Sequence, residues 1–124
     1  MSRRYERLNE QVKRETAEIL RLRVRDPRVI DVRVTGAEVT SDLWLARIYV
    51  RLPQDREARA QARKGLTAAT PYIRRELGQV LRLRRVPELR FEEDRTAEAA
   101  ERIESLLKEA GIEADDEAPD ASDP

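Results

Sequence analysis

The chain has 124 residues, with 25 Lys or Arg, 25 Asp or Glu, and neither cysteine nor histidine. This length predicts one domain that is large enough to fold without disulfides or a bound metal. The absence of cysteine excludes disulfides and thiolate metal sites, and the absence of histidine removes the commonest general base. No apolar run approaches the roughly 18 residues that cross a bilayer, and the first fifteen residues do not resemble a secretory signal, so we expect a cytoplasmic protein without cofactor or membrane contact.

The overall charge of zero hides a segregation along the chain. Residues 1–91 carry 22 Lys or Arg against 12 Asp or Glu, a net charge of +10, and residues 92–124 carry 3 against 13, a net charge of −10. This asymmetry predicts a body that binds a polyanion, followed by an acidic tail. Almost all the basic charge is guanidinium, which grips phosphate through two parallel hydrogen bonds.

The first predicted elements are a helix and a hairpin. Apolar residues at helical spacing indicate an amphipathic helix over residues 3–24, which Asp26-Pro27 ends. Residues 32–39 alternate as a strand does. The next strand, residues 44–52, is the clearest in the chain. Its predicted buried face carries Trp44, Ala46, Ile48, Val50 and Leu52.

Two helices separated by a break are predicted next. Residues 55–69 repeat small apolar residues at helical spacing, and Thr70 is expected to cap a new helix in which Pro71 occupies the first turn. The new helix buries Ile73, Leu77, Val80 and Leu81. On its helical wheel Gly78 falls within a single basic arc, where a ligand would approach the backbone closely. That arc consists of Arg74, Arg75, Arg82 and Arg85.

The C-terminal part predicts a third strand and a last helix. Residues 87–94 form the strand, with Leu89 and Phe91 facing inward. Thr96 is expected to cap a helix that Gly111 ends, and Leu106 and Leu107 are expected to pack. Residues 112–124 are acidic and poor in large apolar side chains, so we expect them to be disordered. The predicted organisation is a domain over residues 1–111 and a tail over residues 112–124.

The resulting order is helix, strand, strand, helix, break, helix, strand and an added helix. This α+β order is that of the type II KH domain, which binds single-stranded nucleic acid with its helix–break–helix.

The sequence resembles the ribosome-binding factor A family over about residues 4–110. The matching fragments are "DPR" (26–28), "DLWLARIYV" (42–50), "YIRREL" (72–77) and "LRRVPELRFEED" (83–94), with Thr96 after them. Where the family has an Ala-x-Gly kink, this chain has Ala69, Thr70 and Pro71. The resemblance implies a non-catalytic KH-like assembly factor with a role in growth in the cold. Its implied partners are the immature small ribosomal subunit and its ribosomal RNA, bound late in maturation.

The candidate RNA-binding residues are basic side chains of the predicted helices. Arg74 and Arg84 match basic positions of the family, and the others follow from charge and helical spacing. We expect a protein that is monomeric when free. The full set is Arg74, Arg75, Arg82, Arg84, Arg85, Lys64, Arg3, Arg4 and Arg7.

Several alternatives stay open. The arginine arc is either a binding surface or a solvated helix face, and Arg33, Arg47 and Arg51 either bind RNA or protect a sheet edge. Tyr49 either stacks on a base or packs against arginine stems. Trp44 and Phe91 are predicted to be core residues. The carboxylates of "EED" (92–94) are the best candidate for magnesium chemistry, and a stand-alone binder of other RNA is the main alternative function.

Overall fold

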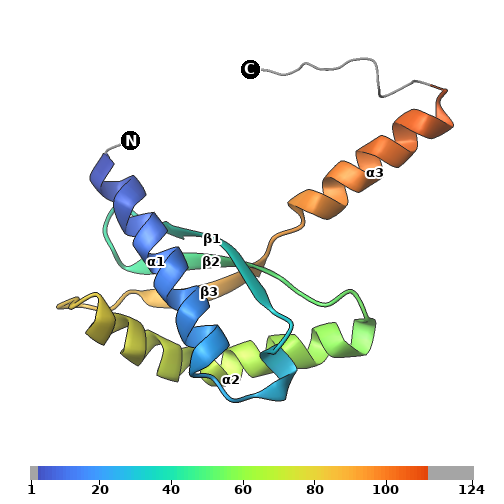
Figure 1. The fold of residues 1–124 in the computed structure, drawn as a ribbon. Helices are drawn as coiled ribbons and strands as arrows, with labels where there is room; N and C mark the ends of the chain where they lie inside the picture. The colour runs from blue at the N-terminus through green and yellow to red at the C-terminus, as the bar shows by residue number, and fades with distance from the viewer. Residues whose placement is uncertain (1–2, 112–124) are drawn as a thin grey trace. The chain divides into compact units, whose positions relative to one another are not determined.

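The computed structural model describes residues 3–111, which form two compact units divided between Asp94 and Arg95. Figure 1 shows the elements in chain order. The first unit contains α1 (Arg3–Leu22), the 3-10 helix η1 (Pro27–Val29), β1 (Arg33–Val39), β2 (Leu45–Arg51), α2 (Arg56–Val80) and β3 (Glu88–Glu93). The second contains α3 (Thr96–Glu109). The predicted α+β, KH-like fold is confirmed.

The sheet of the first unit has the strand order β1-β2-β3. β1 and β2 are antiparallel, with Val39 opposite Ala46 and a register shift between Val34 and Gly36. β2 and β3 are parallel, with Ile48 opposite Phe91. Parallel neighbours need a long crossover connection, and α2 supplies it.

The core lies between the sheet and the helices α1 and α2. Alternate residues of β2, among them Ile48 and Val50, are buried against residues from both helices, such as Ile19 and Ile73. Phe91 is half-buried and packs against this core, so it faces inward as predicted. The prediction for Trp44 is wrong, because β2 begins at Leu45 and 59% of the Trp44 surface is exposed.

The predicted helix–break–helix is a single helix, so this prediction is wrong. α2 runs through Pro71 without interruption for 25 residues. Its ribbon bends near the middle (Figure 1). Proline has no N–H, so the usual bond to the carbonyl of Thr67, four residues earlier, cannot form, and such a gap bends a helix.

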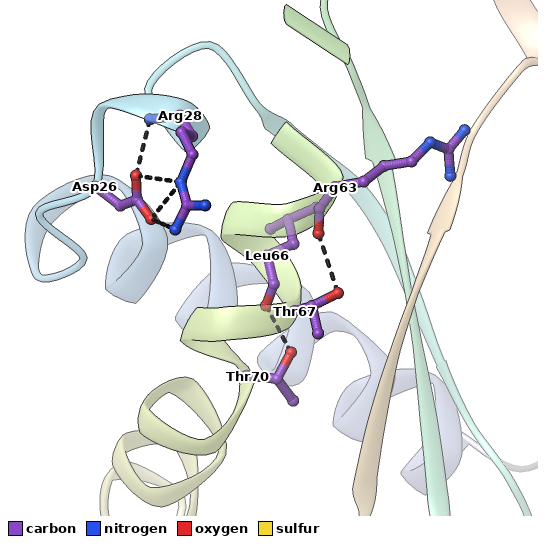
Figure 2. Close-up of polar contacts among 6 residues, drawn as sticks. All are labelled: Asp26, Arg28, Arg63, Leu66, Thr67 and Thr70. Atoms are coloured by element: carbon purple, nitrogen blue, oxygen red, sulfur yellow. Dashed lines mark hydrogen bonds and ion pairs between the residues drawn. The ribbon is translucent and has the colours of Figure 1, made fainter. Parts of the chain in front are cut away.

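Two threonines bond back to the turn before Pro71, as Figure 2 shows. The Thr67 hydroxyl donates to the Arg63 carbonyl at 3.0 Å, and the Thr70 hydroxyl donates to the Leu66 carbonyl at 2.7 Å. Thr70 therefore donates within the running helix, whereas a cap would accept from the amides of a new one. The helix continues because Leu66, Ile73 and Leu77 all bury their side chains on one stripe, which offsets a proline cost of about 3 kcal/mol.

The "DPR" fragment forms the short helix η1 after α1. Asp26 stands at its N-cap and accepts from the Arg28 amide at 2.9 Å, while the Arg28 guanidinium pairs with the same carboxylate at 2.7 Å (Figure 2). These hydrogen bonds from the Arg28 side chain and amide hold the pKa of Asp26 below its usual value. The turn that follows α1 is therefore held by contacts between Asp26 and Arg28, which are two residues apart.

In the second unit, α3 begins at Thr96 with Arg95 at the N-cap position and no side-chain capping bond there, so the predicted Thr96 cap is wrong. Gly111, in the left-handed conformation with φ of 81°, follows the helix as predicted. More than half of the Leu106 surface is exposed, contrary to the packing expected for it. The predicted tail, residues 112–124, lies outside the described residues. No described helix is both long and apolar enough to span a membrane.

Candidate nucleic-acid interface

α2 ends in a tight turn that carries three of the predicted arginines. The Leu83 amide donates to the Gly78 carbonyl at 2.9 Å and the Arg82 amide donates to the Gln79 carbonyl at 3.3 Å. Together with the φ of 55° at Arg82, these bonds form the Schellman ending of a helix, in which the left-handed position is usually glycine. Because α2 ends at Val80, the single helical arc predicted for the arginines is wrong.

Arg74 holds this turn against the helix. Its Nε donates to the Pro87 carbonyl at 2.9 Å and its Nη2 to the Val86 carbonyl at 2.6 Å. Gly78 faces the same segment, since a Cβ placed there would lie 2.4 Å from Cγ2 of Val86. The glycine therefore makes room for the protein's own chain, not for a ligand as expected, and Arg74 is mainly a structural residue.

The three arginines of the turn present open guanidinium groups. We call Arg82, Arg84 and Arg85 the basic turn. All three are exposed, and within residues 3–111 no carboxylate pairs with any of them. Arg75, on α2 before the turn, is also exposed and lies over the Tyr72 ring, 5.5 Å from its centroid. Donors without an anionic partner are suited to binding phosphate oxygens.

The remaining predicted residues lie on other elements. Lys64 is exposed on the part of α2 that precedes Pro71. Arg4 and Arg7 are exposed on α1, and Arg3 is the first residue of that helix. The nine predicted side chains are thus spread over α1, α2 and the basic turn.

Two arginines of the sheet, Arg33 and Arg47, are engaged within the protein. Arg47 pairs with Glu92 at 3.4 Å, and Arg33 donates to the carbonyls of Ile30 and Val32 at 3.1 Å. The Tyr49 hydroxyl donates to Glu38 at 3.2 Å. Burial and this carboxylate raise the pKa of Tyr49, so the phenol stays neutral in ordinary buffers.

The "EED" carboxylates also have partners inside the protein. Glu93, with 8% of its side chain exposed, pairs with Arg59 at 2.7 Å and with Arg63 at 2.8 Å. The Thr35 hydroxyl donates to Asp94 at 2.6 Å. Across the described part of the chain there is no group of three acidic residues arranged to hold a metal ion.

Sequence reasoning missed one feature beside the basic turn. Trp44, predicted for the core, lies under the guanidinium of Arg85, which is 4.0 Å from the centroid of its ring. The two residues border a hollow of about 340 Å³. The sequence holds one signal for this feature, the turn-forming stretch "TSD" (40–42), whose Asp42 carboxylate accepts from the Trp44 amide just before β2 begins. The complete lining is Trp44, Leu45, Arg74, Arg85, Val86, Glu88 and Arg90.

Comparison with known sequences gives one consistent result. The family model for ribosome-binding factor A matches residues 4–107. Ribosome-binding factor A of Pelobacter propionicus is 43% identical over 115 residues, covering 93% of this chain and 94% of the relative. That of a Synechococcus species is 44% identical over 110 residues, covering 87% and 76%.

Solved structures give the same answer. The crystal structure of Thermus thermophilus ribosome-binding factor A has a TM-score of 0.63 at 27% identity, covering 72% of this chain and 94% of that one. The solution structure of a Thermotoga maritima protein described as a putative ribosome-binding factor A has a TM-score of 0.67 at 28% identity, covering 77% and 92%. A Thermus thermophilus homology model, fitted into the cryo-electron-microscopy map of a 30S–RbfA complex, has a TM-score of 0.59 at 28% identity, covering 71% and 92%. The chain belongs to the ribosome-binding factor A family.

Proposed function

We propose that this protein is a non-catalytic assembly factor that binds the RNA of the immature small ribosomal subunit in the cytoplasm, late in that subunit's maturation. Family membership supports the ribosome as the partner, and the Thermus thermophilus relative fitted into a 30S complex supports the small subunit. In this proposal the protein binds as a monomer, and residues 1–111 form its RNA-binding part. Growth in the cold is the condition that requires the protein most.

The observation that carries the proposal is the basic turn. Arg82, Arg84 and Arg85 are exposed in a segment whose backbone is fixed by the Schellman bonds and by Arg74. Little conformational freedom of this backbone is lost on binding, and the guanidinium groups have no carboxylate within residues 3–111 to compete with phosphate. Arg82 also holds a left-handed backbone that costs an arginine about 1 kcal/mol or more, and such retained strain is frequent at functional positions.

The test is association with small subunits by a matched pair of variants. The variant Arg82→Gly/Arg84→Ser removes two charges from the basic turn, and Arg82→Gly suits the left-handed backbone. The control Arg51→Ser/Arg56→Ser removes two exposed arginines that have no carboxylate partner in the described chain. Arg51 lies on β2, and Arg56 lies at the end of α2 away from the basic turn. We expect the first variant to bind immature subunits about tenfold more weakly or worse, and the control to bind within a few-fold of the parent.

Salt dependence supplies a second measurement. If Arg75 and the basic turn neutralise four phosphates, they contribute roughly −3 to the slope of log affinity against log salt. The first variant then loses about half of that contribution. Equal affinity and equal slope for the two variants would contradict the assignment of the basic turn.

Crosslinking in cells followed by sequencing of the attached RNA tests the partner itself. Small-subunit ribosomal RNA is the expected product, and co-sedimentation is expected with immature small subunits but not with mature 70S ribosomes. Recovery of other RNA in its place would identify a stand-alone RNA-binding protein.

A further inference from the structure

The turn that carries Trp44 is held in one conformation by its own hydrogen bonds. The carboxylate of Asp42 accepts from the Trp44 amide at 3.0 Å and from the Thr40 hydroxyl at 2.7 Å. The Thr40 amide donates to the Leu45 carbonyl at 2.9 Å, and Leu43 adopts a φ of 63° to close the turn. The hydrogen bond from Thr40 and that from the Trp44 amide hold the pKa of Asp42 below its usual value, so the carboxylate is ionised at neutral pH.

A second tether joins Trp44 to the basic turn. The Glu88 amide, at the start of β3, donates to the Trp44 carbonyl at 2.8 Å. Glu88 directly follows Val86 and Pro87, whose carbonyls are held by Arg74. The indole and the basic turn are therefore anchored to the same strand end.

One cation lies over the indole, and more than half of the Trp44 surface is exposed. Arg85 lies 4.0 Å from the centroid of the ring, yet 59% of the Trp44 surface is exposed. The adjoining hollow of about 340 Å³ is lined by Arg74, Arg85 and Arg90, and also by Glu88. A flat aromatic face with arginines around it fits the two parts of a nucleotide, a ring that stacks and a phosphate that carries negative charge.

We propose that Trp44 is a stacking platform for one unpaired base of single-stranded RNA, whose neighbouring phosphates are bound by the basic turn. The inference rests on the proposed RNA binding and adds a base contact to the phosphate contacts. The site lies at the C-terminal end of α2, roughly 14 Å along the helix from the bend at Pro71. Glu88 accepts hydrogen bonds only, so its carboxylate suits the amino group of an adenine, cytosine or guanine.

The sole tryptophan of the chain makes the test direct, because tryptophan emission reports on this position alone. The probes are an eight-residue oligoadenylate and an eight-residue abasic ribose-phosphate chain of the same charge. Binding of both is measured by competition for a labelled RNA, and emission is followed in parallel. We expect the oligoadenylate to quench the emission of Trp44 and the abasic chain to leave it unchanged.

Two variants separate stacking from folding. Trp44→Leu is expected to weaken oligoadenylate binding by about 5- to 150-fold, without change toward the abasic chain. Trp44→Phe keeps an aromatic face and is expected to bind within a few-fold of the parent. Because Trp44 lies outside the core, both variants should melt near the parent's temperature.

The outcomes distinguish this inference from the proposed function. If the parent binds oligoadenylate without a change in emission, or if Trp44→Leu binds it as tightly as the parent, the stacking platform is refuted and RNA binding stands. If the parent binds neither probe nor small subunits, both proposals fail together.

Discussion

The first half of α2 and the basic turn that follows α2 use arginine in opposite ways. Before Pro71, Arg59 and Arg63 share the carboxylate of Glu93, of which only 8% is exposed. After α2, the basic turn has no carboxylate partner within residues 3–111. β3 links the paired arginines to the unpaired ones, because this strand starts beside the basic turn and ends at Glu93. The position of the Glu93 carboxylate, more than the residue type, decides which of these arginines serve the fold and which are open to a ligand.

The largest expected effect comes from removing the shared carboxylate. Glu93→Gln removes the negative charge that Arg59 and Arg63 share at a carboxylate with 8% of its surface exposed, which should cost about 2 kcal/mol. We expect the melting temperature to fall by roughly 10 °C, as measured by circular dichroism. The control is Glu57→Gln, an exposed change on α2 that should alter little. At temperatures below the melting transition, the RNA affinity of Glu93→Gln should equal that of the parent. A loss of affinity would mean that the arginines paired with Glu93 also contribute to RNA binding.

The next effect concerns the bend between the two halves. Pro71→Ala restores an N–H that can bond to the Thr67 carbonyl, so we expect stabilisation of about 1 kcal/mol and a rise in melting temperature of several degrees. Pro53→Ala, outside the helix, should not stabilise the protein. A fall in stability for Pro71→Ala would show that the packing of Ile73 and Leu77 requires the bend.

A smaller effect is expected inside the basic turn. Arg82→Gly relieves the left-handed backbone and should stabilise the protein by up to about 1 kcal/mol, while it weakens RNA binding by removing a charge. Arg84→Ser removes the same charge without a backbone gain and serves as the control. Opposite changes in stability and affinity for Arg82→Gly would mark the turn as binding machinery, whereas unchanged RNA affinity would mark Arg82 as a surface residue.

The smallest effect on stability is expected from deleting residues 112–124. This segment contains six acidic and no basic residues and few large apolar ones. The melting temperature should change by less than about 5 °C. RNA affinity at low salt should rise a few-fold if these acids compete with phosphate for the open arginines, and equal affinity would remove that idea.

The apolar periodicity of the sequence predicts the regular helices and strands, because each of them buries one face. The apolar spacing of α1 and the alternation of β2 predicted both to within a few residues. At Pro71 the local Thr-Pro pattern predicts a helix start, whereas the apolar spacing over the whole segment predicts one continuous helix, which is what the structure has. The stripe Ala62, Leu66, Ala69, Ile73 and Leu77 keeps steps of four, three, four and four residues across the proline, and burial along it outweighs the local cost.

The site was predicted only in part, because its geometry depends on contacts between distant segments. The sequence predicts the arginines of the basic turn as part of one helical arc, but their arrangement depends on where α2 ends. The structural role of Arg74 arises from carbonyls twelve and thirteen residues later. Trp44 faces outward because the Asp42 carboxylate binds its amide and delays the start of β2.

The bend at Pro71 has a consequence for local opening of the helix. A helix normally resists fraying from its middle because each turn is bonded to the turns on either side, and here one backbone bond is missing. In hydrogen exchange we therefore expect two protection levels along α2. Amides near Ala62 and Leu66, anchored through Glu93 and η1, should exchange most slowly. The segment between Pro71 and the basic turn should open at a lower free energy, without unfolding of the rest of the domain.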